Sequence, residues 1–262
     1  MAFLKLEHVS HLYFTTKTYT KALDDISLSI NRGEFVSILG SSGCGKSTLL
    51  SIIAGILKQT KGKVLLNNKP LQQSEHALGY MLQQDYLFPW KTIIDNVLIG
   101  LKVRKMLSED TKNKALKLLD EVGLPQLEDT YPNELSGGMR QRVALVRTLM
   151  TNPEILLLDE PFSALDYQTK LKLENLVYRL LKQYRKTAIL VTHDIGEAIS
   201  LSDRIILMDT NPGRISTIVD VPDVLREKMP FLVRRQPSYQ QLFDQIWEVL
   251  NRGSDENGRG GT

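Results

Sequence analysis

The chain has 262 residues, of which 42% are hydrophobic and 24% are charged, a composition typical of a soluble globular protein that buries a sizeable core. Its formal net charge of +3 is too small to argue for nucleic acid as the main partner. The single cysteine, Cys44, excludes an intrachain disulfide and leaves a cytosolic location unopposed. Neither an apolar run of about 18–20 residues nor a signal-peptide layout is present, so we expect any membrane role to be peripheral.

The N-terminal part of the sequence predicts a series of strands. Residues 3–9 tend towards alternation, and residues 22–30 carry apolar side chains at every second position. Asn31-Arg32-Gly33 then predicts a hairpin-like turn before a short apolar strand over residues 35–39. Tyr13, placed between the first two strands, is either a strand-edge aromatic residue of the core or a ring that stacks on a nucleotide base.

The apolar strand leads into Gly-Ser-Ser-Gly-Cys-Gly-Lys-Ser-Thr, residues 40–48, which matches the phosphate-binding pattern G-x-x-x-x-G-K-[ST]. Residues 48–54 indicate the first turns of a helix, so the pattern has the strand and helix that it requires. We expect the three glycines to adopt positive φ and to let the backbone approach a ligand closely. Backbone N–H groups and the helix N-terminus would then hold an anion, with Lys46 at the β- and γ-phosphates and the Ser47 hydroxyl on Mg²⁺. The predicted cofactor-binding residues are Gly40, Ser41, Ser42, Gly43, Cys44, Gly45, Lys46, Ser47 and Thr48.

Two more strands are predicted, over residues 61–68 and 78–82, before the composition changes. From about residue 85 to residue 153 the pattern is mainly helical, which indicates a helical insertion within a sheet-based domain. Ser108 is the expected N-cap of one of its helices, and Gly123 closes that helix. Leu87-Phe88-Pro89-Trp90 looks like an exposed loop of apolar and aromatic residues. Exposed aromatic patches mark interfaces, so this loop is a candidate interface; local core packing is the alternative.

Within this insertion, Ser136 and the glycines at 137 and 138 precede a helix that runs to about residue 150. A serine hydroxyl with free N–H groups at a helix N-terminus is a second phosphate-binding element, or else a plain N-cap. One γ-phosphate needs only one such device. Two of them in one chain suggest that the second serves a nucleotide bound to another copy.

Strands return over residues 155–158, 187–191 and 204–208, and a helix from about 166 to 184 separates the first two. This alternation predicts a mostly parallel α/β sheet. The first of these strands ends in Asp159 and Glu160. If that strand lies beside the strand of the phosphate loop, Asp159 reaches Mg²⁺ and Glu160 polarises a water as general base; the alternative is a core strand that ends in a charged turn.

The C-terminal part predicts an amphipathic helix, with apolar residues at 242, 243, 246, 247 and 250 on one face. Residues 251–262 are polar and glycine-rich, and we expect them to be disordered.

Taken together, these motifs resemble the ATP-binding subunit of ABC transporters over nearly the whole chain. Residues 40–47 resemble its Walker A motif, residues 155–159 its Walker B motif and residues 135–141 its signature motif. Gln83, residues 163–166 and His193 match the Q-loop glutamine, the D-loop and the switch histidine. Residues 87–90, 135–142 and 211–215 also look like the nitrate, sulfonate and taurine importer branch. Two departures are Ser41, where that branch often has proline, and the stretch after Met229, which matches less well.

The resemblance implies an α/β fold: a P-loop NTPase (RecA-like) core with an N-terminal antiparallel β subdomain and an inserted α-helical subdomain. The expected segments are residues 1–84, the first part of the nucleotide-binding core, and 85–153, the helical subdomain with the signature motif. Residues 154–220 form the second part of the core, and residues 221–262 form a C-terminal helix and polar tail.

The resemblance also implies a function: binding and hydrolysis of ATP to energise an importer of a small organic or inorganic anion or a related solute. Two chains would sandwich two ATP molecules head to tail, so that Ser136 of one chain faces the γ-phosphate held by Lys46 of the other. Tyr13 would then be the adenine-stacking ring, and Gln83 would relay the state of the phosphates to the helical insertion. The site residues that this resemblance implies are Glu160, His193 and Gln83 for catalysis, Ser136, Gly137, Gly138 and Tyr13 for ATP, and Ser47, Gln83 and Asp159 for Mg²⁺.

The partners implied are a second copy of the chain, transmembrane permease subunits and, indirectly, a solute-binding protein, with no nucleic acid; the location implied is peripheral, on the cytoplasmic face of the cell membrane. A rival interpretation is a soluble ABC-type ATPase that acts on nucleic acid or ribosomes. Such proteins usually carry an inserted coiled coil or two cassettes, and this sequence has no sustained heptads and one set of motifs. A non-hydrolysing regulatory subunit is a third possibility, against which intact Lys46, Asp159, Glu160 and His193 argue.

Overall fold

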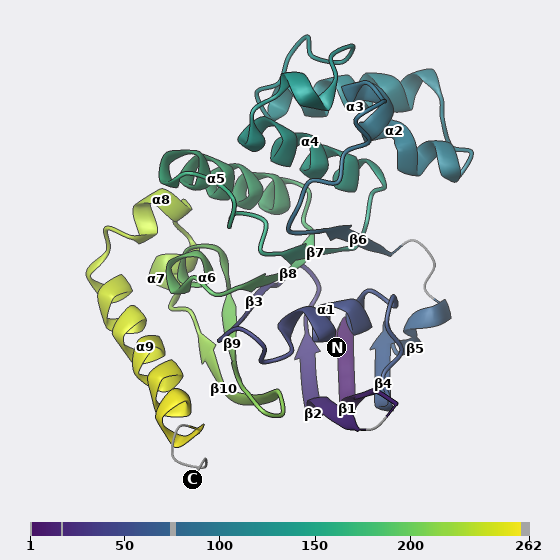
Figure 1. Ribbon diagram of the computed structural model, residues 1–262. Coiled ribbons are helices and arrows are strands. Elements are labelled where there is room, and N and C mark those ends of the chain that lie inside the picture. The colour runs from purple at the N-terminus through teal and green to yellow at the C-terminus, as the bar shows by residue number, and fades with distance from the viewer. Residues whose placement is uncertain (1, 17, 74–76, 258–262) are drawn as a thin grey trace.

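The structure is a computed structural model that describes residues 2–16, 18–73 and 77–257. Two sheets form its lower part in Figure 1, and a group of helices stands above them. The strands are β1 Leu4–Phe14, β2 Tyr19–Ile30, β3 Phe35–Gly40, β4 Lys61–Leu66, β5 Lys69–Pro70, β6 Leu78–Met81, β7 Ile155–Asp159, β8 Thr187–Thr192, β9 Arg204–Asp209 and β10 Arg214–Asp220. The α-helices are α1 Lys46–Ile53, α2 Ile93–Val103, α3 Glu109–Glu121, α4 Gly137–Met150, α5 Tyr167–Gln183, α6 Ile195–Leu201, α7 Asp223–Arg226, α8 Pro230–Val233 and α9 Pro237–Asn257.

The central sheet has six strands in the order β10-β9-β3-β8-β7-β6, all parallel except β10. The expected mostly parallel sheet is therefore confirmed. In β7, Ile155 and Leu157 pack towards α1, whereas Leu156 and Leu158 pack towards the helices on the opposite face. Successive side chains of a strand point to opposite faces, so a strand covered on both sides needs the unbroken apolar run that this sequence has.

A second, antiparallel sheet has the order β2-β1-β4-β5. Helix α1 lies between the two sheets, and its apolar side chains share one core with both. The hairpin expected at residues 31–33 is wrong, because β2 and β3 belong to different sheets. The turn crosses from one sheet to the other, and the Gly33 N–H donates to the Thr187 hydroxyl at 2.8 Å. β3 cannot pair with β2 because β8 and β9 occupy both of its edges.

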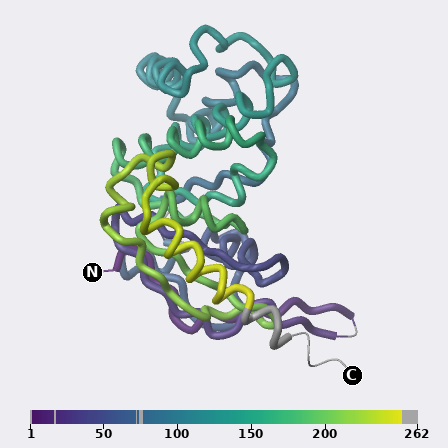
Figure 2. Tube along the Cα trace, turned by 90° about the vertical axis from the view of Figure 1, so that its left-hand side faces the viewer, coloured from purple at the N-terminus to yellow at the C-terminus, as the bar shows by residue number. Residues whose placement is uncertain are grey.

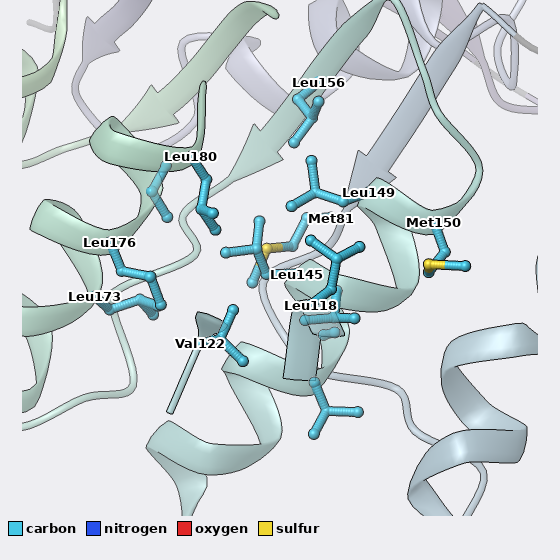
Figure 3. Close-up of a cluster of buried hydrophobic side chains, with 14 of the residues drawn as sticks. Met81, Leu118, Val122, Leu145, Leu149, Met150, Leu156, Leu173, Leu176 and Leu180 are labelled. Carbon is cyan, nitrogen blue, oxygen red and sulfur yellow. The ribbon is translucent and has the colours of Figure 1, made fainter. Parts of the chain in front are cut away.

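The helical part consists of α2, α3 and α4, which stand above the edge of the central sheet (Figure 1). Ser108 caps α3 as expected, in a capping box with Thr111, and Gly123 follows with φ +72°. In Figure 3, Leu118 of α3, Leu145 of α4 and Leu176 of α5 belong to one apolar cluster that includes Leu156 of the sheet. Because this cluster continues across residues 85 and 153, the expected segment boundaries stay predictions.

One expectation for the helical part is corrected in detail. Leu87 of the supposedly exposed loop is only 8% exposed and belongs to the apolar cluster, whereas Trp90 is 72% exposed. The loop is fixed by Asn96, whose side chain accepts from the Phe88 N–H at 2.7 Å and donates to the Phe88 carbonyl at 3.2 Å. The exposed Trp90 therefore stands on a loop whose backbone is held by the Asn96 side chain.

The C-terminal part packs against the other end of the central sheet. Helices α6 to α9 share an apolar core with β9 and β10, and Figure 2 shows α9 running along this side of the molecule. The disorder expected from residue 251 is wrong up to Asn257, where α9 ends; the remaining tail, residues 258–262, lies outside the described residues. A helix already nucleated by packing extends at low cost through polar residues. No helix within the described ranges combines the length and the apolar character needed to cross a membrane.

Candidate nucleotide-binding site

The loop between β3 and α1 has the geometry of an anion cradle. Gly43 and Gly45 have φ values of +82° and +91°, in the left-handed region that favours glycine. The expectation of positive φ is wrong for Gly40, which ends β3 in an ordinary strand conformation. A Cβ there would lie 2.7 Å from both the Cys44 Sγ and the Met208 carbonyl, so close packing, and not backbone freedom, requires glycine at this position.

Lys46 is the first residue of α1 and is only 7% exposed. Its ammonium group donates to the carbonyl oxygens of Gly40 at 2.8 Å and Ser41 at 2.9 Å, so the side chain spans the loop. A buried cation needs such partners. Helix α1 has no side-chain N-cap, because Gly45 precedes it. Its first N–H groups are therefore left for a ligand rather than satisfied by the protein.

The expected oxygen ligands for Mg²⁺ lie next to this loop. The Ser47 hydroxyl donates to the Asp159 carboxylate at 3.3 Å, and the Tyr80 hydroxyl donates to the other Asp159 oxygen at 3.1 Å. Burial raises the pKa of Asp159 above its ordinary value, and burial together with the Asp159 charge raises the pKa of Tyr80 to about 12. Tyr80 was not predicted from the sequence.

The expectation that β7 lies directly beside the strand of the phosphate loop is wrong, because β8 lies between β3 and β7. Asp159 still reaches Ser47, since the carboxyl ends of parallel strands meet at one edge of a sheet and α1 begins at that edge. Ser47 and Asp159 are hard oxygen donors, and Mg²⁺ is usually bound by one or two such protein groups together with phosphates. They fit that ion. Among the residues described, no cluster of three or more His, Cys, Asp or Glu could hold a metal by itself.

Three residues that are distant in the sequence meet just beyond Asp159. The Glu160 carboxylate lies 3.3 Å from the Nδ1 of His193 and accepts a 3.4 Å hydrogen bond from the Gln83 amide. The same amide donates to the Ser163 hydroxyl at 3.3 Å. Glu160 has φ +46°, a left-handed conformation that is unusual for glutamate, and its N–H donates to the Val191 carbonyl. Strained backbone of this kind is typical of functional sites.

A pocket of about 680 Å³ opens over the phosphate loop. Its lining includes these predicted residues: Tyr13, Ser42, Gly43, Gly45, Lys46, Ser47, Thr48, Glu160 and His193. Tyr13 belongs to β1, is 43% exposed, and has its ring edge-on to His11 and its hydroxyl 3.3 Å from the Thr48 hydroxyl. Tyr13 therefore faces the pocket and not the core. Gly40 and Ser41 line a smaller cavity behind the loop, and the Cys44 side chain is buried.

Sequence reasoning missed one wall of this pocket. Residues 20–22 of β2 and the turn at Asn211, Pro212 and Gly213 line it as well. The turn is joined to β2 by hydrogen bonds from the Gly213 N–H to Ala22 and from the Asp24 N–H to Gly213. A Cβ at Gly213 would lie 2.2 Å from the Cys44 carbonyl, so only glycine fits against the loop. The Asn-Pro-Gly turn signature was visible in the sequence, but the long-range packing was not.

The residues Ser136, Gly137 and Gly138 do not line the pocket that contains Lys46. Ser136 is the N-cap of α4 and accepts from the Met139 N–H at 3.4 Å. The turn is joined instead to the strand end at Gln83, because the Gln141 amide donates to the Gln83 carbonyl at 3.0 Å. Arg140 also forms an ion pair with Asp85 at 3.0 Å. These links through Arg140, Gln141 and Asp85 were not predicted.

Comparisons with known proteins agree with this geometry. The sequence profile of the family described as "ABC transporter" matches residues 23–163. The chain is 58% identical over 251 residues to an uncharacterized ABC transporter ATP-binding protein of Bacillus subtilis, covering 96% of each. It is 38% identical to a taurine import ATP-binding protein of Rhizobium johnstonii, covering 96% of this chain and 98% of that one. A solved dimeric structure of an ATP-binding cassette in a post-hydrolysis state, bound to ADP and Pi, has a TM-score of 0.74 and 35% identity, and the match covers 84% of this chain and 99% of that one.

Proposed function

The chain belongs to the ABC transporter family, and on that premise we propose that it is the ATP-hydrolysing subunit that energises an importer of a small anion of the nitrate, sulfonate or taurine type, or of a related small solute. As a member of this family it binds ATP and hydrolyses it to ADP and phosphate to drive transport. The observation that carries the proposal is the single pocket in which Tyr13, Lys46, Glu160 and His193 converge.

The residues of this pocket divide the proposed reaction among them. Tyr13 stacks on the adenine, and the N–H groups of the loop together with Lys46 hold the phosphates. Glu160 accepts the proton of the attacking water, and His193, at 3.3 Å from Glu160, fixes the position of that carboxylate and contacts the γ-phosphate. Gln83 contacts Glu160 and also accepts from Gln141 of α4, which supports its proposed relay role.

Mg²⁺ completes the proposed cofactor set, with Ser47, Asp159 and Gln83 as its protein neighbours. When bound with the nucleotide, this ion neutralises charge on the phosphate oxygens. The protein's contribution is to hold the two oxygen donors of Ser47 and Asp159 3.3 Å apart at the mouth of the loop. The Tyr80 hydroxyl orients the Asp159 carboxylate from behind.

The proposed partners are a second copy of the chain and transmembrane permease subunits. Ser136, Gly137 and Gly138 are exposed or half-exposed and lie outside the pocket of their own chain, which supports a head-to-tail dimer with a second copy. Trp90 is the proposed contact with a transmembrane permease, because a large exposed aromatic side chain on an anchored loop is typical of interfaces. A solute-binding protein would act through the permease, and the chain would sit peripherally on the cytoplasmic face of the membrane.

The alternative of a soluble ATPase acting on nucleic acid or ribosomes finds no support in these matches, one of which is named for taurine import. The experiment that separates the two functions is a pull-down of the tagged chain from detergent-solubilised membranes of its source cell. We expect a multi-span membrane protein to co-purify and to be lost with Trp90→Ala. Trp247→Ala is the matched control, since Trp247 is 53% exposed on α9, away from the loop. Co-purification of nucleic acid or ribosomes in place of a membrane protein would overturn the transport function.

A further inference from the structure

A buried ionic network lies beside the candidate site. Glu174 of α5 is fully buried, and its carboxylate accepts two hydrogen bonds from Arg234, at 2.7 and 3.1 Å. Arg234 follows directly after α8 and is itself largely buried. Bidentate arginine–carboxylate pairs fix geometry in two directions, so this contact sets the position of α8 relative to α5.

A second part of the network holds both chain neighbours of His193. Lys170, in the first turn of α5, forms ion pairs with Asp194 at 2.6 Å and with Glu197 at 2.5 Å. Asp194 is also the N-cap of α6, where it accepts from the Glu197 N–H. The Thr192 hydroxyl donates to Glu197 and accepts from the Asp194 N–H. His193 is exposed to the pocket, but the residues before and after it are fixed.

The C-terminal segment, residues 222–250, touches this loop at two places. At Gly196 of α6, a Cβ would lie 3.0 Å from the Tyr239 hydroxyl and 3.6 Å from the Arg234 Nε, so these two side chains pack directly on the turn after His193. Further along α9, Val249 and Leu250 line a cavity of about 260 Å³ whose other walls include Ser41 and His193. Figure 1 shows α8 beside α6 and α9 continuing along the same side of the molecule.

We propose that the C-terminal segment is a positioning element for His193, and that Arg234, Glu174 and Lys170 are the positioning residues through which it acts. This inference rests on the proposed role of His193 in ATP hydrolysis. Lys170 is shared by Asp194 and Glu197, and Arg234 is paired with the buried Glu174, so moving either cation leaves a carboxylate unpaired. Docking of the segment therefore selects one conformation of the His193 loop, with the imidazole beside Glu160.

The first test is nuclear magnetic resonance of the histidine side chains. The chain has four histidines, so the spectrum is simple, and His193→Gln identifies the signal of His193. The informative variant is Arg234→Met combined with Glu174→Gln, which removes both charges and leaves no buried carboxylate unpaired. We expect its His193 signal to shift or broaden, whereas Arg226→Met, at the exposed pair with Asp223 on α7, leaves the signal unchanged. A His193 signal identical to the wild type in the folded double variant would overturn the proposal.

The second test is steady-state ATP hydrolysis by the same variants. We expect kcat of the double variant to fall at least fivefold with KM within about twofold, and Arg234→Lys to retain more of the activity than Arg234→Met. An unchanged kcat in the folded double variant would contradict the positioning role. If the wild-type chain hydrolyses no ATP, alone or with its membrane partner, the proposed function fails, and the histidine spectra still decide whether the segment positions His193.

Discussion

The phosphate loop and the turn at Ser136 are both glycine-flanked helix N-termini, but they differ in capping and in the residues that surround them. Helix α1 has no side-chain cap, and residues from β1 and from the loops after β7 and β8 converge over it into one pocket. Helix α4 is capped by its own Ser136, and no residue of the turn lines that pocket. A helix N-terminus is thus only part of a phosphate site. The first is completed within the chain, and we propose that the second meets a nucleotide held by another chain.

The largest effect is expected at the completed site. Glu160→Gln removes the proposed general base, since an amide cannot take a proton from water, and keeps the shape of the side chain. We expect turnover to fall about 10²–10⁴-fold with ATP still bound. Phosphate release at saturating ATP measures turnover, and binding of a fluorescent ATP analogue measures affinity. If the Glu160→Gln variant hydrolyses ATP at the wild-type rate, Glu160 is not the general base.

The next prediction compares the serine cap of the Ser136 turn with the serine cap of α3. Ser136→Ala and Ser108→Ala each remove a serine N-cap in the helical part, and each is expected to cost about 1 kcal/mol of stability. Only Ser136→Ala should slow turnover, on the order of 10²-fold, because it removes a donor to the phosphate of the second chain. Its effect on ATP affinity of the isolated chain should stay within about twofold. Equal turnover in the two variants would mean that Ser136 is a plain cap.

Lys46→Ala should change the ATP affinity of the single chain, which Ser136→Ala leaves nearly unchanged. It removes a charged donor from the pocket, so we expect ATP affinity of the single chain to fall about 10–10²-fold, in line with hydrogen bonds of about 1.5–3 kcal/mol to charged groups. Titration with a fluorescent ATP analogue measures this. Lys63→Ala, an exposed change on β4, is the control. An unchanged affinity in Lys46→Ala would contradict the phosphate-loop assignment.

The smallest effect concerns Tyr80, behind the Asp159 carboxylate. Its pKa is raised from 10.0 to about 12 by burial and by Asp159, so the folded state favours the neutral phenol. Stability from this group is therefore complete below about pH 10 and is lost as the pH rises towards 12. In Tyr80→Phe, the free energy of unfolding, measured with urea, should fall less steeply across this window than in the wild type. Equal slopes would show that Tyr80 does not titrate in a buried setting.

The sequence predicted the parts of the site that depend on local pattern. The strand, glycine loop and helix around Lys46 and the paired carboxylates Asp159 and Glu160 depend on a few neighbouring residues, and the structure places them together. Long-range packing was not predictable. The insertion of β8 between β3 and β7 and the fit of Gly213 against Cys44 are set by pairing between distant segments.

Burial was misjudged where a local apolar run had two possible environments. Leu87 and Trp90 belong to one short loop, but only Leu87 reaches the apolar cluster. The network of Arg234, Glu174 and Lys170 is invisible in the sequence for the same reason, because its members come from parts of the chain up to 64 residues apart that only the fold brings together.

The most direct test of the central claim, that two chains complete one another's sites, is sedimentation of the Glu160→Gln variant with and without ATP and Mg²⁺. The account predicts a monomer without nucleotide, a dimer with ATP and Mg²⁺, and no ATP-induced dimer when Ser136→Arg is added. A Glu160→Gln chain that binds ATP yet stays monomeric, or an ATP-induced dimer that survives Ser136→Arg, would contradict it.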